Sequence, residues 1–196
     1  VPDGVPVSVM YPGADVEAFR PDLPYADLTE AHGVAGRPLV VCVSRLVARK
    51  GQDVLIRAMP EIRRRAPDAA LLIVGDGPDR ERLERLASDA PDGSVAFAGE
   101  VSESDLPRYY RAGDVFAMPC RNRLGGLEVE GWGNVFIEAA ACGRPVVVGD
   151  SGGARESLVP GETGLLVDGS DGAQVSDAVG SLLADPGGPA WSSFAS

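Results

Sequence analysis

Two carboxylates stand out by their spacing. Glu130 and Glu138 lie eight positions apart in the stretch LEVEGWGNVFIEAAACG, which covers residues 127–143. Carboxylates in such a place can accept hydrogen bonds from the hydroxyl groups of a ligand. The alternatives are a solvated loop acid at Glu130 and, at Glu138, a side chain that only complements a helix dipole.

The residues between the two glutamates predict a turn followed by a helix. Gly131 and Gly133 disfavour a helix, whereas Asn134 is a good N-cap for the apolar run VFIEAAAC that follows. The backbone N–H groups near Val135 and Phe136 would then point out of the helix N-terminus, where anions bind readily. We therefore expect the first glutamate in a loop, the second in the helix, and an anion site between them.

A second stretch carries two positive charges. Arg45 and Lys50 lie in SRLVARKG, residues 44–51, directly after an apolar run. Lys50 is the only lysine beside 17 arginines, which indicates that a compact, flexible ammonium is needed here. Phosphate binding is the favoured interpretation, and a solvated basic loop is the alternative.

Two further loops can meet a ligand. In the tight turn GDGP, Gly75 and Asp76 would let the backbone approach a ligand, although a plain turn explains them equally well. In GEV, which ends another apolar run, Val101 would offer main-chain groups to a nucleotide base. An anion site combined with hydroxyl-binding carboxylates describes a sugar nucleotide. The glycine patterns of dinucleotide-binding and P-loop proteins are absent.

Six short apolar runs would form the framework that positions these loops. They are continuously apolar rather than alternating, which is typical of parallel strands with helices on both faces. Ligands bind such sheets beyond the carboxyl ends of the strands, where the loops above lie. The pattern predicts the α/β class with an open, doubly wound, mainly parallel (Rossmann-like) sheet. The expected strands cover residues 38–44, 70–75, 95–99, 115–119, 145–150 and 164–168.

Helical periodicity between these runs predicts the connecting helices. Apolar residues from Val54 to Ile62 recur at helical spacing, and Pro60 is expected to kink or shorten that helix. Ser102 in SESD is expected to cap the start of another helix. Further helices are expected over residues 79–90, 134–142, 153–158 and 171–185.

The chain divides into three parts. Residues 1–36 hold several prolines and little periodicity, so we expect an arm or linker there; residues 37–185 would form the ligand-binding domain, and residues 186–196 a tail. The net charge is −11, of which −5 falls on residues 1–36 and −6 on residues 150–196. The region between them is balanced and can host an anionic ligand, whereas the overall charge argues against a nucleic-acid partner.

Cysteine and histidine usage limits the chemistry further. Cys42, Cys120 and Cys142 are odd in number and lack metal-ligand spacing, so we expect reduced thiols in a cytoplasmic protein. His32 is the only histidine, which argues against a Ser-His-Asp triad or a histidine-ligated metal. No apolar run is long enough to span a bilayer, and no secretory signal opens the chain. The first residue, Val1, indicates a piece of a longer protein.

Taken together, the motifs resemble the C-terminal, donor-binding half of retaining glycosyltransferases of family four, which have the GT-B fold. The similarity covers about residues 38–185, and the two glutamates are its most specific part. RLGGLEVEG is most similar to actinobacterial phosphatidylinositol mannosyltransferases, and YPGADVEAFRP resembles the segment that leads into the second domain of such enzymes. The other similar segments, in the family's order, are SRLVARKG, LLIVGDGP, VAFAGEV, DVFAMPC, GLEVEGWGNVFIEAAACGRPVVVGDSGGARE and GETGLLVD.

The resemblance implies a role for each candidate residue. Arg45 and Lys50 would be catalytic cations that hold the donor diphosphate and offset the charge on the leaving group. Glu130, also assigned to catalysis, would contact hydroxyls of the transferred sugar, and Glu138 would bind the ribose. The phosphates would lie between the glutamates, held from across the crevice by the two cations. The remaining donor-binding positions implied are Gly75, Asp76, Val101, Gly133, Asn134, Val135, Phe136 and Glu138.

The resemblance also implies the substrates. GDP-mannose would be the donor and a phosphatidylinositol-type lipid the acceptor, with retention of configuration and with neither a metal nor another cofactor. Family members also have an acceptor-binding N-terminal half with a histidine that His32 does not match, so we expect the isolated chain to be inactive. The full-length enzyme would be cytoplasmic and peripheral at the inner face of the plasma membrane. Two alternatives stay open: a UDP-sugar-dependent transferase with a small-molecule acceptor, and a non-catalytic nucleotide-binding module.

Overall fold

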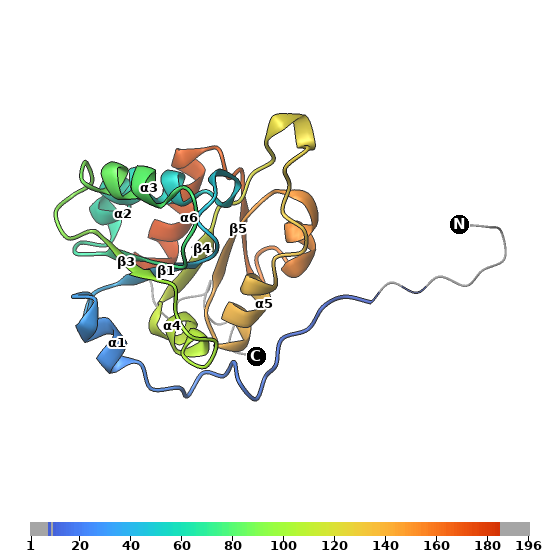
Figure 1. Ribbon diagram of the computed structural model, residues 1–196, viewed down its shortest axis with the longest axis horizontal. Helices are drawn as coiled ribbons and strands as arrows, with labels where there is room; N and C mark the ends of the chain where they lie inside the picture. Colours follow the sequence, from blue (N-terminus) through green and yellow to red (C-terminus); the bar gives the residue numbers. More distant parts are fainter. Residues whose placement is uncertain (1–7, 9, 185–196) are drawn as a thin grey trace.

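Six parallel strands form one open sheet at the centre of the molecule (Figure 1). The computed structural model describes residue 8 and residues 10–184, so the expected tail at 186–196 lies outside the described residues. Each strand lies within one of the six runs predicted above, which confirms the framework. The strands are β1 (Leu39–Val43), β2 (Ala70–Val74), β3 (Val95–Gly99), β4 (Val115–Met118), β5 (Val146–Gly149) and β6 (Gly164–Val167).

The order of the strands creates a crevice in the middle of the sheet. The order is β3-β2-β1-β4-β5-β6, and every neighbouring pair is parallel. β1 pairs with β2 on one side, with Leu39 opposite Ala70, and with β4 on the other, with Val40 opposite Val115. β2 and β3 lie on one side of β1, and β4, β5 and β6 lie on the other. The topological switch point is therefore between β1 and β4.

The central strands are stable in this arrangement because both of their faces are covered. All residues of β1, β2, β4 and β5 are buried, and Leu71, Leu72 and Ile73 are 0% exposed. Complete burial of a large aliphatic side chain contributes about 1.5–3 kcal/mol. The continuous rather than alternating apolar pattern of these runs follows from this two-sided burial.

Helices cover both faces of the sheet. α2, α3 and α6 pack on one face, and α4 and α5 lie on the other, with α1 beside α4 (Figure 1). The α-helices are α1 (Ala26–Ala31), α2 (Gln52–Arg65), α3 (Arg80–Ala87), α4 (Leu106–Ala112), α5 (Asn134–Ala141) and α6 (Gly172–Ala184). The 3₁₀ helices are η1 (Ala48–Lys50), η2 (Leu124–Gly126) and η3 (Gly152–Ser157), the last where an α-helix was predicted.

The predicted shortening of the helix at Pro60 is wrong. α2 continues past Pro60 to Arg65, and Pro60 is exposed on its surface. The opposite side of the helix is held by Leu55, Met59 and Ile62, each 0% exposed. The packing of this apolar face outweighs the local loss of a backbone hydrogen bond on the solvent side.

The start of α4 also differs from the prediction. Ser102 does not cap the helix; its Oγ accepts a hydrogen bond from the N–H of Asp105 (3.1 Å) and so closes a turn before the helix. The helix begins at Leu106, with Pro107 as its second residue. Proline is favoured in the first turn of a helix, where its missing N–H needs no acceptor, and this position therefore fits a late start.

The arm that precedes the sheet is fixed to the α4–α5 face. The sequence did not reveal α1, which is short and has a single buried residue, Thr29. Phe19 packs edge-on against Tyr110 (5.7 Å between ring centroids), and Tyr11 stacks on Trp132 (4.7 Å). The arm therefore reaches the loop in which Glu130 lies.

Candidate functional site

The loops after β1 and β4 meet at the switch point of the sheet. The loop after β1 carries Arg45 and Lys50, and the loop after β4 leads to Glu130. The N–H of Arg121 donates a hydrogen bond to the carbonyl oxygen of Arg49 (2.9 Å), which joins the two loops directly. The fold thus brings together residues about 80 positions apart in the chain, at the place where open α/β sheets bind their ligands.

Hydrogen bonds from the buried Gln52 side chain and from the backbone hold the loop after β1 in place. Gln52, which is 0% exposed, donates from Nε2 to Ser44 Oγ (2.8 Å) and to the carbonyl oxygen of Arg45 (3.1 Å). The N–H of Leu46 donates to the carbonyl oxygen of Asp76 (2.9 Å). The side chain of Arg45 is exposed. The loop is therefore fixed at its backbone while the guanidinium stays free to reach a ligand.

The glycine turn after β2 packs against that loop. A Cβ at Gly75 would lie 2.2 Å from the carbonyl oxygen of Ser44, and one at Gly77 would lie 2.4 Å from that of Leu46. Both glycines are therefore explained by chain packing. Asp76 is exposed, and hydrogen bonds from the N–H of Gly77 and, next, from Arg80 hold the pKa of its carboxyl group below the usual value. A donor-binding role for Gly75 and Asp76 stays a prediction.

Lys50 and Glu130 form a buried ion pair. Lys50 Nζ lies 2.7 Å from Glu130 Oε2, and the two side chains are 11% and 8% exposed. Gly51 makes this possible: its φ is +80°, and a Cβ there would lie 2.0 Å from the carbonyl oxygen of Pro119. The sequence analysis placed the two groups on opposite sides of a crevice, whereas the folded chain brings them into contact.

The surroundings of this pair have little access to water. Cys120 lies beside it with its Sγ 3.2 Å from the carbonyl oxygen of Gly149. Burial, and then the negative charge of Glu130, raises the pKa of the Cys120 thiol to about 12. The three cysteines are buried free thiols, as predicted. Charges in such surroundings interact more strongly with a ligand than charges in water do.

Glu138 is half-buried on α5 and has a protein partner. Tyr110 Oη donates a hydrogen bond to Glu138 Oε2 (2.6 Å). Burial, and then the charge of Glu138, raises the pKa of Tyr110 well above the ordinary value, so the phenol stays a donor. The two predicted glutamates therefore stand in different settings: Glu130 contacts a cation and Glu138 a phenol.

The N-terminus of α5 is built differently from the prediction. Gly133, not Asn134, is the N-cap residue, with φ +81°, and Asn134 is an exposed first residue of the helix. A Cβ at Gly133 would lie 2.6 Å from the ring of Phe136, so the turn is made where only glycine fits. In the described part of the chain no side chain caps this helix. The N–H groups of Asn134 and Val135 have no acceptor within the helix, as an anion site requires. The prediction is wrong for Phe136, whose N–H donates to the carbonyl oxygen of Gly133 (3.0 Å).

Val101 follows β3 at the same edge of the sheet. It is half-buried and packs against the apolar core. Its side chain is thereby accounted for by packing. A contact between its backbone and a nucleotide base stays a prediction.

Several residues that shape the site were missed by the sequence analysis. Asp53, 7% exposed at the start of α2, lies 3.0 Å from Arg121 and 3.2 Å from Arg57. Ser151, 1% exposed, accepts a hydrogen bond from the N–H of Glu130 (3.0 Å). No spacing rule connects such partners because 20 residues or more separate most of them in the chain.

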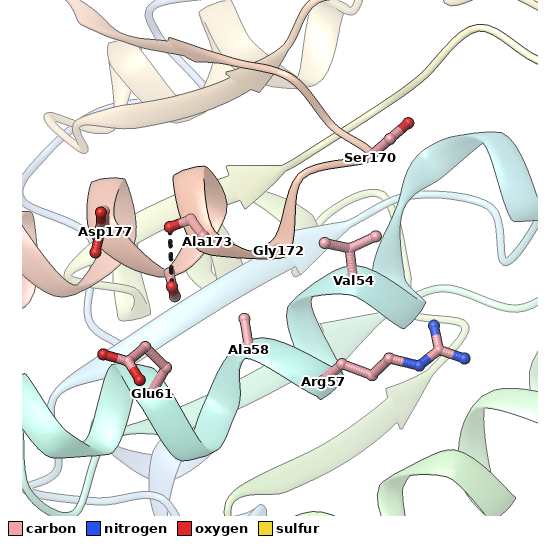
Figure 2. Close-up of a pocket in the computed structure, with 9 residues that line it drawn as sticks. Val54, Arg57, Ala58, Glu61, Ser170, Gly172, Ala173 and Asp177 are labelled. Atoms are coloured by element: carbon pink, nitrogen blue, oxygen red, sulfur yellow. Dashed lines mark hydrogen bonds between the residues drawn. The ribbon is translucent and has the colours of Figure 1, made fainter.

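A separate cavity, the α2–α6 groove, lies between α2 and α6 (Figure 2). Its volume is about 470 Å³, and it is lined by small side chains such as Ala58 and Ala173 and by the charged Arg57, Glu61 and Asp177. None of the predicted site residues lines it. It runs along α2 and α6 and reaches Ser170 in the loop after β6.

Two features are missing from the described residues. No group of three or more His, Cys, Asp or Glu side chains that could hold a metal ion is found among residues 8 and 10–184. Within the same part of the chain, no helix has both the length and the apolar character needed to cross a bilayer.

Relatives of known activity are similar to the chain over most of its length. It is 54% identical over 177 residues to the GDP-mannose-dependent alpha-(1-6)-phosphatidylinositol monomannoside mannosyltransferase of Mycolicibacterium smegmatis, with 89% of this chain and 46% of the relative covered. It is 46% identical over 188 residues to a GDP-mannose-dependent monoacylated alpha-(1-6)-phosphatidylinositol monomannoside mannosyltransferase of Corynebacterium glutamicum, with 95% and 47% covered. The chain thus spans about half the length of these curated relatives.

A solved structure shares the fold. The crystal structure of Anabaena Alr3699/HepE in complex with UDP superposes with a TM-score of 0.80 at 26% identity, covering 96% of this chain and 51% of that one. The family of glycosyl transferases group 1 matches residues 37–185. The chain belongs to the group 1 glycosyltransferases, with the Rossmann-like sheet of the GT-B fold.

Proposed function

We propose that this chain is the donor-binding half of a retaining glycosyltransferase that transfers mannose from GDP-mannose to a phosphatidylinositol-type lipid. The observation that carries the proposal is the buried pair of Lys50 and Glu130, 2.7 Å apart, at the switch point of the sheet. A buried charge pair is costly to maintain and is weak evidence for stability, so its place at the ligand edge favours a functional role.

In this proposal, cations and helix amides bind the diphosphate. Lys50 Nζ has three N–H donors, so it can contact a phosphate oxygen while it stays beside Glu130. Arg45 is exposed and can approach the same phosphates, and the N–H groups at the start of α5 face the same edge. When the bond between the anomeric carbon and the phosphate oxygen breaks, these groups offset the negative charge that develops on the diphosphate.

The two glutamates would bind different parts of the donor. The Glu130 carboxylate would accept hydrogen bonds from hydroxyls of the mannose, and Lys50 would keep it oriented. Glu138, oriented by Tyr110, would accept from the ribose hydroxyls. The backbone near Val101 would meet the base, and the turn at Gly75 and Asp76 would complete the nucleotide site.

The identity of the substrates rests on the relatives. Both mannosyltransferases described above are named for GDP-mannose and for a phosphatidylinositol mannoside acceptor. The part of these relatives that the chain does not match would supply the acceptor site and the contact with the membrane surface. For this reason we expect the chain alone to bind donor only weakly and not to transfer mannose, and we expect no need for a metal ion.

A second candidate differs in the donor. The HepE structure contains UDP, which favours a UDP-sugar with a small-molecule acceptor as the alternative. A nucleotide-binding module without transfer activity would have no need for a sugar-facing carboxylate beside Lys50.

Calorimetric titration of the 196-residue chain with GDP-mannose and UDP-glucose, side by side, tests the proposal. The expected result is tighter binding of GDP-mannose, unchanged by a metal chelator. Preferred binding of UDP-glucose would support the second candidate, and equal binding of GDP and GDP-mannose would support a plain nucleotide module.

A further inference from the structure

The hydroxyl of Ser151 joins two segments of the loop that carries Glu130. Ser151 follows β5 and is 1% exposed. Its Oγ accepts a hydrogen bond from the backbone N–H of Glu130 (3.0 Å) and donates one to Asn122 Oδ1 (2.7 Å). One buried side chain therefore connects the start and the end of the loop formed by residues 122–130.

Few other contacts join the two ends of the loop at residues 122–130 to each other. It extends from the body of the domain after β4 and returns at Glu130 (yellow in Figure 1). Arg123 and Glu128 pair across it through their backbones (2.9 and 3.2 Å) and through an ion pair (2.8 Å), with side chains 39% and 41% exposed. Exposed ion pairs contribute little to stability. The bridge through Ser151 is thus the main buried polar anchor of the Glu130 backbone on this side.

The two residues after Ser151 follow the same backbone closely. Gly152 has φ +53°, and a Cβ there would lie 1.9 Å from the carbonyl oxygen of Glu130. The N–H of Gly153 donates to the carbonyl oxygens of Glu130 (3.2 Å) and Gly131 (3.0 Å). Residues 151–153 therefore contact both the N–H and the carbonyl group of Glu130 and fix its peptide groups on either side.

We propose that Ser151 is a positioning residue, which sets the place of the Glu130 carboxylate relative to the sugar of the donor. This inference rests on the proposed function. The carboxylate is held at its far end by Lys50 and at its backbone by Ser151. A small displacement of a group that positions a substrate weakens its interaction strongly, so loss of the hydroxyl should affect the sugar contact selectively.

Three variants separate positioning from a general structural role. Ser151→Ala removes the bridge. Asn122→Ala removes only the acceptor of the Ser151 hydroxyl, and because Asn122 is exposed, this variant keeps the test available if Ser151→Ala does not fold. Ser157→Ala is the matched control: it ends the 3₁₀ helix η3, which Ser151 precedes, and its hydroxyl donates to the carbonyl oxygen of Ala154 (2.6 Å).

The first readout is the affinity of the 196-residue chain for GDP-mannose and for GDP, measured by calorimetry. Ser151→Ala should weaken GDP-mannose binding about five- to tenfold, as expected for one lost hydrogen bond, and GDP binding less than about twofold. Asn122→Ala should act in the same direction, about two- to threefold, and Ser157→Ala should leave both affinities unchanged. An equal loss for both ligands in Ser151→Ala, or no loss for either, would overturn the inference.

The second readout needs no donor. Amide hydrogen exchange should be about tenfold faster at Glu130 in Ser151→Ala than in Ser157→Ala, because the hydrogen bond from the Glu130 N–H to Ser151 is lost. Unchanged exchange would contradict the inference whatever the donor titrations give. Failure of the unaltered chain to bind any nucleotide sugar would instead refute the proposed function, and with it the sugar-positioning role.

Discussion

Two regions of the molecule place charged side chains next to a concave surface, and they hold those charges in opposite ways. At the carboxyl edge of the sheet, Lys50 and Glu130 are 11% and 8% exposed and contact each other. In the α2–α6 groove (Figure 2), Arg57 and Asp177 are 58% and 59% exposed. The charges of the groove are exposed, whereas those of the edge are buried.

This difference favours the carboxyl edge of the sheet as the candidate site. A solvent-exposed ion pair costs little to form and contributes little, so it accumulates on any helix surface. A buried pair must overcome the loss of hydration of two charges. Removal of one partner leaves the other charge buried without compensation, which is strongly destabilising. We therefore interpret the edge as the functional site and the groove as a surface feature.

The largest effect should follow from breaking the buried pair. Lys50→Ala leaves Glu130 buried without its cation and should lower the free energy of unfolding by about 3 kcal/mol. It should also weaken donor binding by about 1.5–3 kcal/mol, the contribution of a charged hydrogen bond to phosphate. Denaturant unfolding and calorimetric titration measure the two effects.

The groove supplies the control for this prediction. Arg65→Ala removes the partner of Asp177, with side chains 43% and 59% exposed, and should cost less than about 1 kcal/mol without altering donor affinity. The double variant Lys50→Met/Glu130→Gln should recover most of the lost stability, since no unpaired charge remains. Near-normal turnover and donor affinity of the full-length enzyme with Lys50→Ala would rule out the phosphate role.

The next effect separates the two glutamates of the site. Glu130→Ala should weaken binding of GDP-mannose by about 1.5–3 kcal/mol more than it changes binding of GDP. Glu138→Ala should weaken binding of both ligands to a similar extent, because the ribose is common to them. Titration of both variants with both ligands checks this division, and equal losses in all four titrations would contradict it.

A smaller effect should follow from Tyr110→Phe. This change removes the donor to Glu138 Oε2, 2.6 Å away, while the ring keeps its contacts with Phe19 and Phe116. We expect a loss of about 1 kcal/mol in unfolding free energy and a similar loss in GDP affinity. If the affinity for GDP is unchanged while stability falls, the hydrogen bond has a structural role only.

The smallest effect belongs to the groove. Asp177→Asn removes an exposed carboxylate that pairs with Arg65 and should change the unfolding free energy by no more than about 0.5 kcal/mol. Donor affinity should stay the same within error. A clear loss of nucleotide-sugar binding in this variant would transfer the functional role from the edge to the groove.

The framework of the site could be predicted from the sequence because it depends on local patterns. Buried parallel strands must be continuously apolar, so all six could be recognised, and the loops that follow them carry the candidate residues. The helix ends were harder to predict. At α2 the packing of Leu55 and Met59 overrides Pro60, and at α5 the fit of Gly133 over the ring of Phe136 displaces Asn134 from the cap position.

The contacts within the site could not be predicted, because they join distant parts of the chain. Lys50 and Glu130 are in different loops, and only the neighbouring positions of β1 and β4 bring them together. The same holds for Tyr110 with Glu138 and for Ser151 with the Glu130 backbone. Residue type and spacing identified which groups can do chemistry, whereas the fold decides which of them touch.

A crystal structure of this chain with GDP-mannose would test the central claim most directly. We predict that the diphosphate lies between Lys50 and the N-terminus of α5, with a mannose hydroxyl within hydrogen-bonding distance of the Glu130 carboxylate. Donor bound in the α2–α6 groove, or bound at the edge with its mannose turned away from Glu130, would contradict the account.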